Sequence, residues 1–171
     1  MTLTIPESAI AEGNVYGVYV PTLATDSAAT LIAGINLSNF LMPDWDGATP
    51  NQNTGEDRRF SSRQTWAKFG RTSWEIAPLV YTYLPQQLGT PGHAANKVYE
   101  GLAPGNKGWL GLGYGILPTK TLAANDIFDF FPVECGVQGK QARGQDEFSP
   151  LTVTQRLIVT GPARLDRKLV A

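Results

Sequence analysis

The chain has 171 residues, 42% of them hydrophobic, and a formal net charge of −1 at pH 7. This composition predicts a single globular domain over residues 1–171 and excludes a disordered chain. The one cysteine, Cys135, excludes an intrachain disulfide and a cysteine metal cluster, and the sequence shows neither a signal-peptide pattern nor an apolar run of membrane-helix length, so we expect cytoplasmic synthesis.

The charges are segregated along the sequence. Residues 1–57 hold seven acidic residues and no Lys or Arg, a net charge of −7, whereas residues 58–171 hold eight acidic and 14 basic residues, a net charge of +6. Folding can mix the two signs on one surface. Alternatively, an acidic patch of one subunit meets a basic patch of the next, and head-to-tail contacts of this kind build rings or filaments.

The first quarter of the chain predicts a strand, a short helix and a second strand. Residues 15–20, VYGVYV, are β-branched and aromatic, which is typical of a strand. Asp26 is a candidate N-cap for a helix that runs through Ala33 and ends at Gly34. Residues 35–41 alternate apolar and polar side chains, which predicts a strand.

A polar segment follows at residues 42–57, MPDWDGATPNQNTGED. Its Pro, Asp, Asn, Gly and Thr content predicts a long loop or an extended hairpin tip, and long ordered loops in compact domains are usually functional. Residues 58–69 and 73–84 predict two strands that form a hairpin around the Phe69-Gly70-Arg71 turn, with an edge or a bulge at Pro78.

The second half predicts one amphipathic helix and three further strands. The helix spans residues 93–102, and its apolar stripe consists of Ala94, Ala95, Val98, Tyr99 and Leu102. The expected strands are 109–117, 126–140 and 149–161, with a loop at 141–148 and a C-terminal arm at 162–171. Short strands with one substantial helix predict a mainly β fold, a β-sandwich or barrel with a helix attached.

Glycines are conspicuous in EGLAPGNKGWLGLGYG, residues 100–115. Neither phosphate-binding template fits, because Lys107 is followed by Gly108 rather than Ser or Thr, and Ile116 stands where a dinucleotide fingerprint requires its third glycine. The glycines at 111, 113 and 115 alternate along a strand and leave one face nearly bare. We expect another backbone or a bulky aromatic to press on that face, from helix 93–102 or from an adjoining subunit.

The sequence offers no clear catalytic or metal site. His93 is the only histidine and reads as a turn residue, and Cys135 reads as a buried strand cysteine. Asp126 and Asp129 point to opposite faces of one strand, so they do not form a carboxylate pair. A small-molecule-binding β-barrel, even with hydrolase activity, remains an alternative that requires an apolar pocket with convergent polar groups.

The order of several segments resembles the major tail tube proteins of bacteriophages with long, non-contractile tails, over about residues 15–162. The segments that carry the resemblance are SAATLIAGINLSNFL, EDRRFSSRQTWAKFGRTSWEIAPLVYTYLPQ, AANKVYEGLAPG, KGWLGLGYG and DIFDFFPVECGVQGKQARGQDEFSPLTVTQRLIVTGP. The resemblance implies a β-sandwich with one flanking helix, and a structural protein without cofactor or enzymatic activity. It also implies hexameric rings that stack into a tube, with the inner sheets of six subunits joined into one barrel around the lumen.

The same resemblance implies partners and a location. The partners are further copies of the chain, a tape measure protein, tail terminator and tip proteins, and double-stranded DNA that passes through the lumen without sequence-specific binding. No membrane partner is implied, and the expected location is the tail of the virion. A neck or tail-completion protein of similar fold is the alternative, which would cap a tube rather than repeat along it.

On this reading the sequence assigns four sets of residues. The polar loop makes an inter-ring contact through Asp44, Trp45, Asp46, Asn51, Asn53, Glu56 and Asp57. A basic set contacts a neighbouring subunit through Arg58, Arg59, Arg63, Arg71, Arg164 and Arg167. The helix packs on the sheet through Ala95, Val98, Tyr99 and Leu102. The close-approach glycines are Gly111, Gly113 and Gly115.

Overall fold

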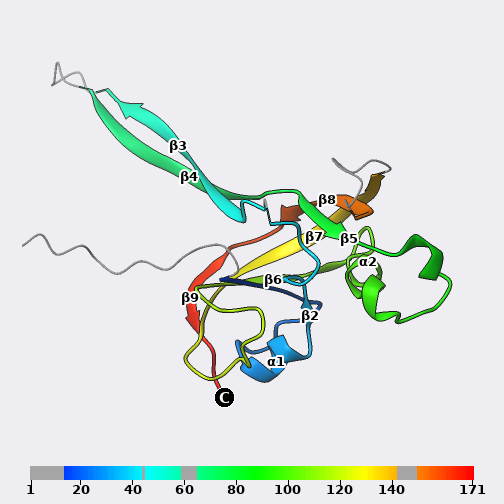
Figure 1. Ribbon diagram of the computed structural model, residues 1–171. Coiled ribbons are helices and arrows are strands. Elements are labelled where there is room, and N and C mark those ends of the chain that lie inside the picture. Colours follow the sequence, from blue (N-terminus) through cyan, green and yellow to red (C-terminus); the bar gives the residue numbers. More distant parts are fainter. Residues whose placement is uncertain (1–13, 44, 59–64, 142–149) are drawn as a thin grey trace, which may run out of the picture.

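A computed structural model describes residues 14–43, 45–58, 65–141 and 150–171. Figure 1 shows one curled sheet with short helices at its side and a long two-stranded hairpin that projects from it, so the mainly β prediction is confirmed. The strands are β1 (Val15–Val20), β2 (Ile35–Asn36), β3 (Ala48–Asp57), β4 (Trp66–Ile76), β5 (Leu79–Thr82), β6 (Lys107–Tyr114), β7 (Ile127–Gln141), β8 (Thr152–Val159) and β9 (Arg164–Lys168). The helices are α1 (Ala28–Ile32) and α2 (Lys97–Gly101), with 3₁₀ turns η1 (Pro85–Gln87) and η2 (Ala94–Asn96).

The large sheet is antiparallel and nearly closes on itself. Its strand order is β2-β1-β6-β7-β8-β5, and β9 pairs with the first part of β7. The segment after β2 reaches the free edge of β5, where Leu41 bridges Tyr81 and the Met42 amide donates to the Val80 carbonyl at 2.9 Å. Closure of this kind leaves few exposed strand edges. Because the sheet curls on itself, one continuous sheet encloses the sandwich-like interior.

Each face of the sheet carries its own apolar cluster. Side chains alternate along a strand, so β1, β6 and β7 contribute to both clusters. The inner cluster, inside the curl, includes Tyr19, Leu37, Tyr81, Leu110, Leu112, Phe131 and Leu157. The outer cluster lies under α1 and includes Val18, Leu31, Phe128, Phe130 and Leu169. None of the helices in the described residues is long and apolar enough to cross a membrane.

The glycines of β6 give room to aromatic side chains of the neighbouring strand. A Cβ at Gly111 would lie 3.1 Å from Phe130 Cε1, and a Cβ at Gly113 would lie 2.7 Å from Phe128 Cζ. Val18 of β1, at 3.0 Å from the Cβ at Gly111, and Ile116, at 2.8 Å from the Cβ at Gly113, press on the same positions. The pressing groups thus belong to the same chain and not to residues 93–102, which corrects that expected source. Gly115 is not a close-approach position: a Cβ there would meet nothing within 4 Å, and its φ of +73° is what favours glycine.

The helix near residue 26 and the C-terminal segment both differ from expectation in detail. Ser27, rather than Asp26, caps α1, because its Oγ accepts from the Thr30 amide at 3.2 Å. The expected strand 35–41 is paired with β1 only at 35–36 before the chain turns toward β5. The C-terminal segment 162–171 is held against the sheet, because β9 pairs with β7 and Leu169 is buried within the outer cluster.

The predicted helix 93–102 is a 3₁₀ turn followed by α2. The break lies at Asn96, which is fully buried and exchanges two hydrogen bonds with the backbone of Leu84, at 2.8 and 3.0 Å. Val98 and Leu102 are fully buried in the inner cluster, Tyr99 is half-buried against it, and Ala95 is also half-buried. A polar side chain of β8 holds the end of the helix, because Gln155 Nε2 donates to the Leu102 carbonyl at 2.7 Å.

The predicted pairing of residues 42–84 is wrong in two respects. Residues 48–57, expected as part of a long loop or an extended hairpin tip, form the strand β3, and β4 continues through Phe69-Gly70-Arg71 to pair with β3. The turn therefore lies between β3 and β4 and not at residue 70. Pro78 does break the strand, as expected, because β4 ends at Ile76 and β5 begins at Leu79. Residues 59–64 of the expected strand 58–69, and nearly all of the expected loop 141–148, lie outside the described residues.

Candidate assembly surfaces

The hairpin of β3 and β4, here called the arm, is the most prominent feature of the surface (Figure 1). Side chains on both of its faces are exposed to solvent along most of its length. Ten residues of strand extend about 30 Å at about 3.3 Å per residue. An isolated two-stranded hairpin is marginally stable in water, so this arm is suited to packing against another molecule.

The root of the arm is fixed to the body. Ile76 is buried, and the Trp74 ring meets Phe131 edge-on with 5.2 Å between the ring centroids. Trp45, which the sequence assigned to an inter-ring contact, is half-buried, donates its indole N–H to the Ala77 carbonyl at 2.9 Å and packs against the inner cluster. These contacts set the direction in which the arm leaves the sheet.

A β-bulge decides which side chains share a face of the arm. Gln52 pairs with Thr72 but Thr54 pairs with Phe69, so β4 carries one extra residue at Gly70-Arg71. Phe69 is five residues from Trp74 and would lie on the opposite face of a regular strand. The bulge returns Phe69 to the face of Trp74 and Ile76, where its side chain is 77% exposed.

The acidic residues of β3 are paired within the arm, whereas Glu75 of β4 faces Arg156 of β8 at 3.9 Å. Glu56 meets Arg58 at 2.7 Å and Asp57 meets Lys68 at 2.5 Å, and all but Asp57 are well exposed. Exposed pairs of this kind contribute about 0–1 kcal/mol, so a partner molecule can exchange them at little cost. Of the other predicted loop residues, Asp46 is exposed near the root and Asn51 and Asn53 are exposed on β3, while Asp44 lies outside the described residues.

The predicted basic set is split by the fold. Arg164 and Arg167 both bind Asp26, at 3.3 and 2.9 Å, and Arg164 also stacks over the Trp109 ring at 4.5 Å. They tie β9 to the turn before α1, so part of the charge segregation is resolved within one subunit. Arg71 is exposed in the bulge of the arm. Arg59 and Arg63 lie outside the described residues, and Arg58 pairs with its own Glu56.

A second exposed surface lies beside the root of the arm, on the last residues of β6, the first of β7 and the edge strand β9. Leu112 pairs with Asp129, so two residues further along Tyr114 stands opposite Ile127, and Ile127 pairs with Lys168. We call Tyr114, Ile127, Leu165 and Lys168 the root surface. Its three apolar members are 53%, 47% and 42% exposed, respectively.

Tyr114 links the root surface to the arm. Its hydroxyl hydrogen-bonds the backbone of Ala48, the first residue of β3. Burial of the hydroxyl, and then the nearby Asp129 carboxylate, raise the pKa of Tyr114 above its ordinary value of 10.0. Phe69 and the root surface were not among the contacts predicted from the sequence. The sequence feature that could have indicated such contacts is a large apolar residue within a polar stretch, such as Phe69 in a segment of Lys, Arg and Thr.

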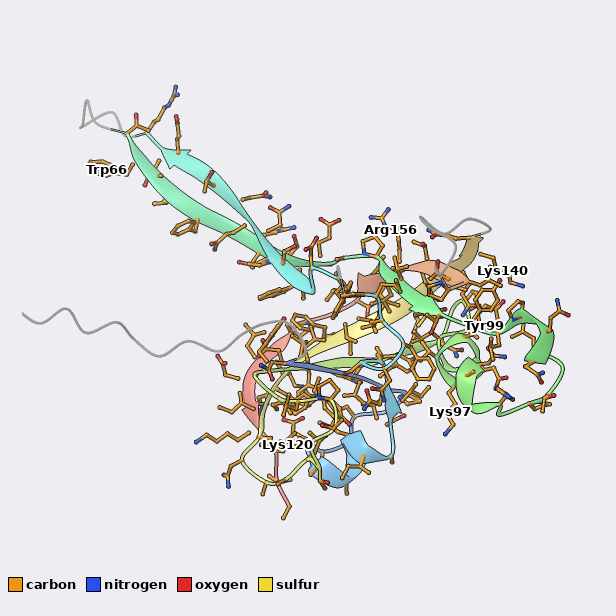
Figure 2. All side chains as sticks on the ribbon, viewed as in Figure 1. Trp66, Lys97, Tyr99, Lys120, Lys140 and Arg156 are labelled. Atoms are coloured by element: carbon orange, nitrogen blue, oxygen red, sulfur yellow. The ribbon has the colours of Figure 1, made fainter. Side chains whose placement is uncertain are left out.

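Figure 2 shows how far the arm carries its side chains, with Trp66 at its far end and Arg156 on β8 of the body. Trp66 pairs with Asp57, whereas Phe69 pairs with Thr54. These two β3 residues are three apart, so Trp66 and Phe69 lie on opposite faces of the arm. The arm therefore carries one exposed aromatic side chain on each face near its end.

The polar groups weighed as chemistry have structural partners. His93 Nδ1 accepts from the Ala95 amide at 3.3 Å at the start of η2. Cys135 is buried, and burial raises the pKa of its thiol. Asp126 accepts from Lys120 at 2.5 Å and Asp129 accepts from the Asp166 amide at 2.7 Å. Within the described part of the chain, no group of three or more His, Cys, Asp or Glu side chains is placed to hold a metal ion.

Comparison with known proteins agrees with the resemblance seen in the sequence. A family model described as Phage tail tube protein matches residues 2–171. No curated protein matches the chain. The family match extends beyond residues 15–162, where the resemblance was noticed, and includes the arm, the root surface and β9. Because the match covers almost the whole sequence, the chain belongs to the phage tail tube protein family.

Proposed function

We propose that this chain assembles into hexameric rings that stack into the tail tube of a virion, the conduit through which the genome is delivered. Family membership supports the tube, and the arm is the single structural observation that carries the stacking. Its polar strands have no core of their own, and pairing with a neighbouring ring would supply the contacts that an isolated hairpin lacks. The arm contains residues 48–57 of the predicted loop 42–57 as its strand β3, so the inter-ring role expected for that segment is kept and extended to β4.

The other expected partners follow from a tube. A tape measure protein would occupy the lumen during assembly, and terminator and tip proteins would close the two ends. Double-stranded DNA would pass through without base-specific contacts. The chain acts in this proposal by shape and self-association, in keeping with a structural family.

The test is assembly of the purified chain, followed by electron microscopy and light scattering. We expect rings and open-ended tubes, whose length grows with protein concentration. A protein that caps a tube would give single rings or short complexes of fixed size. A purified chain that stays monomeric even at high protein concentration would contradict the proposal.

A shortened arm tests the stacking role. Residues 51–73 are replaced by Asn-Gly, a two-residue hairpin turn, between Pro50 and Trp74, which pair in the arm. Because the root contacts of Trp74 and Ile76 remain, we expect a folded protein with an unchanged melting temperature that forms no tubes. Normal tubes from this variant would show that the arm does not join the rings.

A further inference from the structure

The face of the arm that carries Phe69, here called the Phe69 face, also carries apolar side chains that pack against the body at the root of the arm. Ile76 and Trp74 of this face pack against the inner cluster, and the bulge at Gly70-Arg71 keeps Phe69 on the same side. Trp74 and Phe69 pair with β3 residues that are four apart, which places Phe69 about 13 Å beyond Trp74 along the arm. Phe69 is 77% exposed at that distance. The body of the subunit therefore packs against Trp74 but not against Phe69.

The same face carries a charge beside the aromatic ring. Glu56 pairs with Ala67, next to the Thr54–Phe69 pair, and alternation along β3 places Glu56 on the Phe69 face. Its bond to Arg58 joins two exposed side chains and is readily exchanged. A partner surface for this face therefore needs an apolar patch with a cation at its edge.

The root surface has this composition. Tyr114, Ile127 and Leu165 are exposed, and Lys168 stands directly opposite Ile127 on the edge strand β9. The Asp129 carboxylate, near Tyr114 on the same face, already accepts a hydrogen bond from the Asp166 amide at 2.7 Å. Among the described residues, Lys168 makes no ion pair, in contrast to Arg164 and Arg167 on the same strand. Aromatic side chains that enter apolar patches surrounded by polar contacts are the usual anchors of protein interfaces.

We propose that the Phe69 face of one copy docks on the root surface of a second copy, with Phe69 against Ile127 and Leu165 and with Glu56 beside Lys168. This inference rests on the proposed function and names the contact that would join two rings. The two surfaces differ, so the contact is head-to-tail, and each copy offers one arm and receives another. Repeated head-to-tail contacts either close into a ring or extend without end, and the contact proposed here, between successive rings, is of the extending kind.

An intermolecular disulfide tests the contact directly. The native chain has one cysteine, Cys135, which is buried, so engineered cysteines can be followed without interference. A Phe69→Cys, Ile127→Cys double variant is co-assembled with wild-type chain, so that assembly does not depend on the substituted ring, and is then oxidised. We expect covalent dimers and higher species on a non-reducing gel, which disappear with reductant.

The control moves the first cysteine to the other face of the arm. A Trp66→Cys, Ile127→Cys variant is assembled and oxidised in the same way, and we expect at least about a tenfold lower yield of covalent dimer, because disulfides form only where Cα atoms come within about 7 Å. Equal yields from the two variants, or no covalent product from Phe69→Cys, Ile127→Cys in assembled tubes, would overturn the inference.

A charge exchange tests the Glu56–Lys168 contact. Glu56→Lys and Lys168→Glu each place like charges together, and we expect each to raise the protein concentration needed for assembly by about tenfold. The double variant restores opposite charges and is expected to assemble near the wild-type concentration. A double variant as impaired as the sum of its singles would overturn this pairing.

The two proposals fail in distinguishable ways. If wild-type chain forms no tubes, the proposed function fails and this contact fails with it. If wild-type chain forms tubes, the shortened arm forms none, and the cysteine and charge tests are negative, the arm joins rings through a different surface. In that case the stacking role stands and only the root surface is excluded as the receiving site.

Discussion

Gly113 stands where β6 has almost no room for a side chain. A Cβ there would lie 2.7 Å from Phe128 Cζ and 2.8 Å from Ile116 Cδ1, both in the outer cluster. Valine suits a strand by propensity, but overpacking of this kind typically costs about 1–3 kcal/mol. We expect Gly113→Val to lower the free energy of unfolding by that amount in denaturant titrations.

Gly89 provides the matched control. A Cβ at this position would meet nothing within 4 Å, and the backbone has no positive φ there. Gly89→Ala is expected to leave stability unchanged or to raise it slightly, because it lowers the entropy of the unfolded chain. A Gly113→Val protein as stable as wild type would show that Phe128 and Ile116 can move aside, and would remove close approach as the reason for the glycine.

Asp126 gives a pH-dependent contribution to stability. The hydrogen bond from Lys120, followed by one from the Ala123 amide, lowers the pKa of Asp126 below its ordinary value of 3.8. A carboxylate with a lowered pKa in the folded state stabilises the fold fully above its unfolded pKa, and this stabilisation is lost as the pH falls through the folded value. We expect Asp126→Asn to melt below wild type at pH 7 and to approach it below about pH 4. Melting curves across this range test it, and a gap independent of pH would contradict the assignment.

At the scale of elements, α2 is held by one buried face. Val98 is fully buried, whereas its neighbour Lys97 is exposed. Val98→Asp would bury a charge without a partner, which costs several kcal/mol in order of magnitude, so we expect loss of soluble protein or a large drop in melting temperature. Lys97→Asp, on the exposed side of the same helix, is the control and should fold normally. A soluble Val98→Asp variant with an unchanged melting temperature would mean that this face does not support the fold.

The elements that the sequence predicted well are those with one buried side. β1, β6, β7 and β8 alternate large apolar residues, such as Leu110 and Leu112 or Phe128 and Phe130, against the two clusters of the sheet. α1 has a short apolar segment between a capping Ser and a Gly. These elements could be predicted because each buries one side, and the periodicity of its hydrophobic residues shows which side that is.

The elements that were missed bury little within the chain. β3 is exposed along nearly its whole length, and its Thr, Pro, Asn, Gln and Gly residues predicted a loop or an extended hairpin tip rather than a strand. Its register depends on the bulge at Gly70-Arg71, and a single extra residue has no periodic signal. β9 was predicted as a C-terminal extension because its side chains are mostly charged, although Arg164 and Arg167 form ion pairs with Asp26. Phe69 and the root surface were not predicted for the same reason, since contacts with another molecule leave no buried pattern in one chain.

At the scale of the whole molecule, the fold divides into a closed body and an open arm. The body nearly closes its sheet through the Leu41–Tyr81 bridge, while the arm leaves most of its side chains, including the Phe69 and Trp66 rings, exposed to solvent. A body of this kind can be stable alone, whereas the arm gains its contacts only from other copies. This division is suited to subunits that fold first and stack afterwards.

A three-dimensional cryo-electron microscopy reconstruction of tubes formed by the purified chain tests the central claim most directly. The account predicts stacked rings in which the density of each arm leaves its own subunit and ends on a subunit of the next ring. The length of β3, about 30 Å, sets the scale of the distance that the arm bridges. Tubes in which every arm lies within its own ring, or a chain that forms no tubes, would contradict the account.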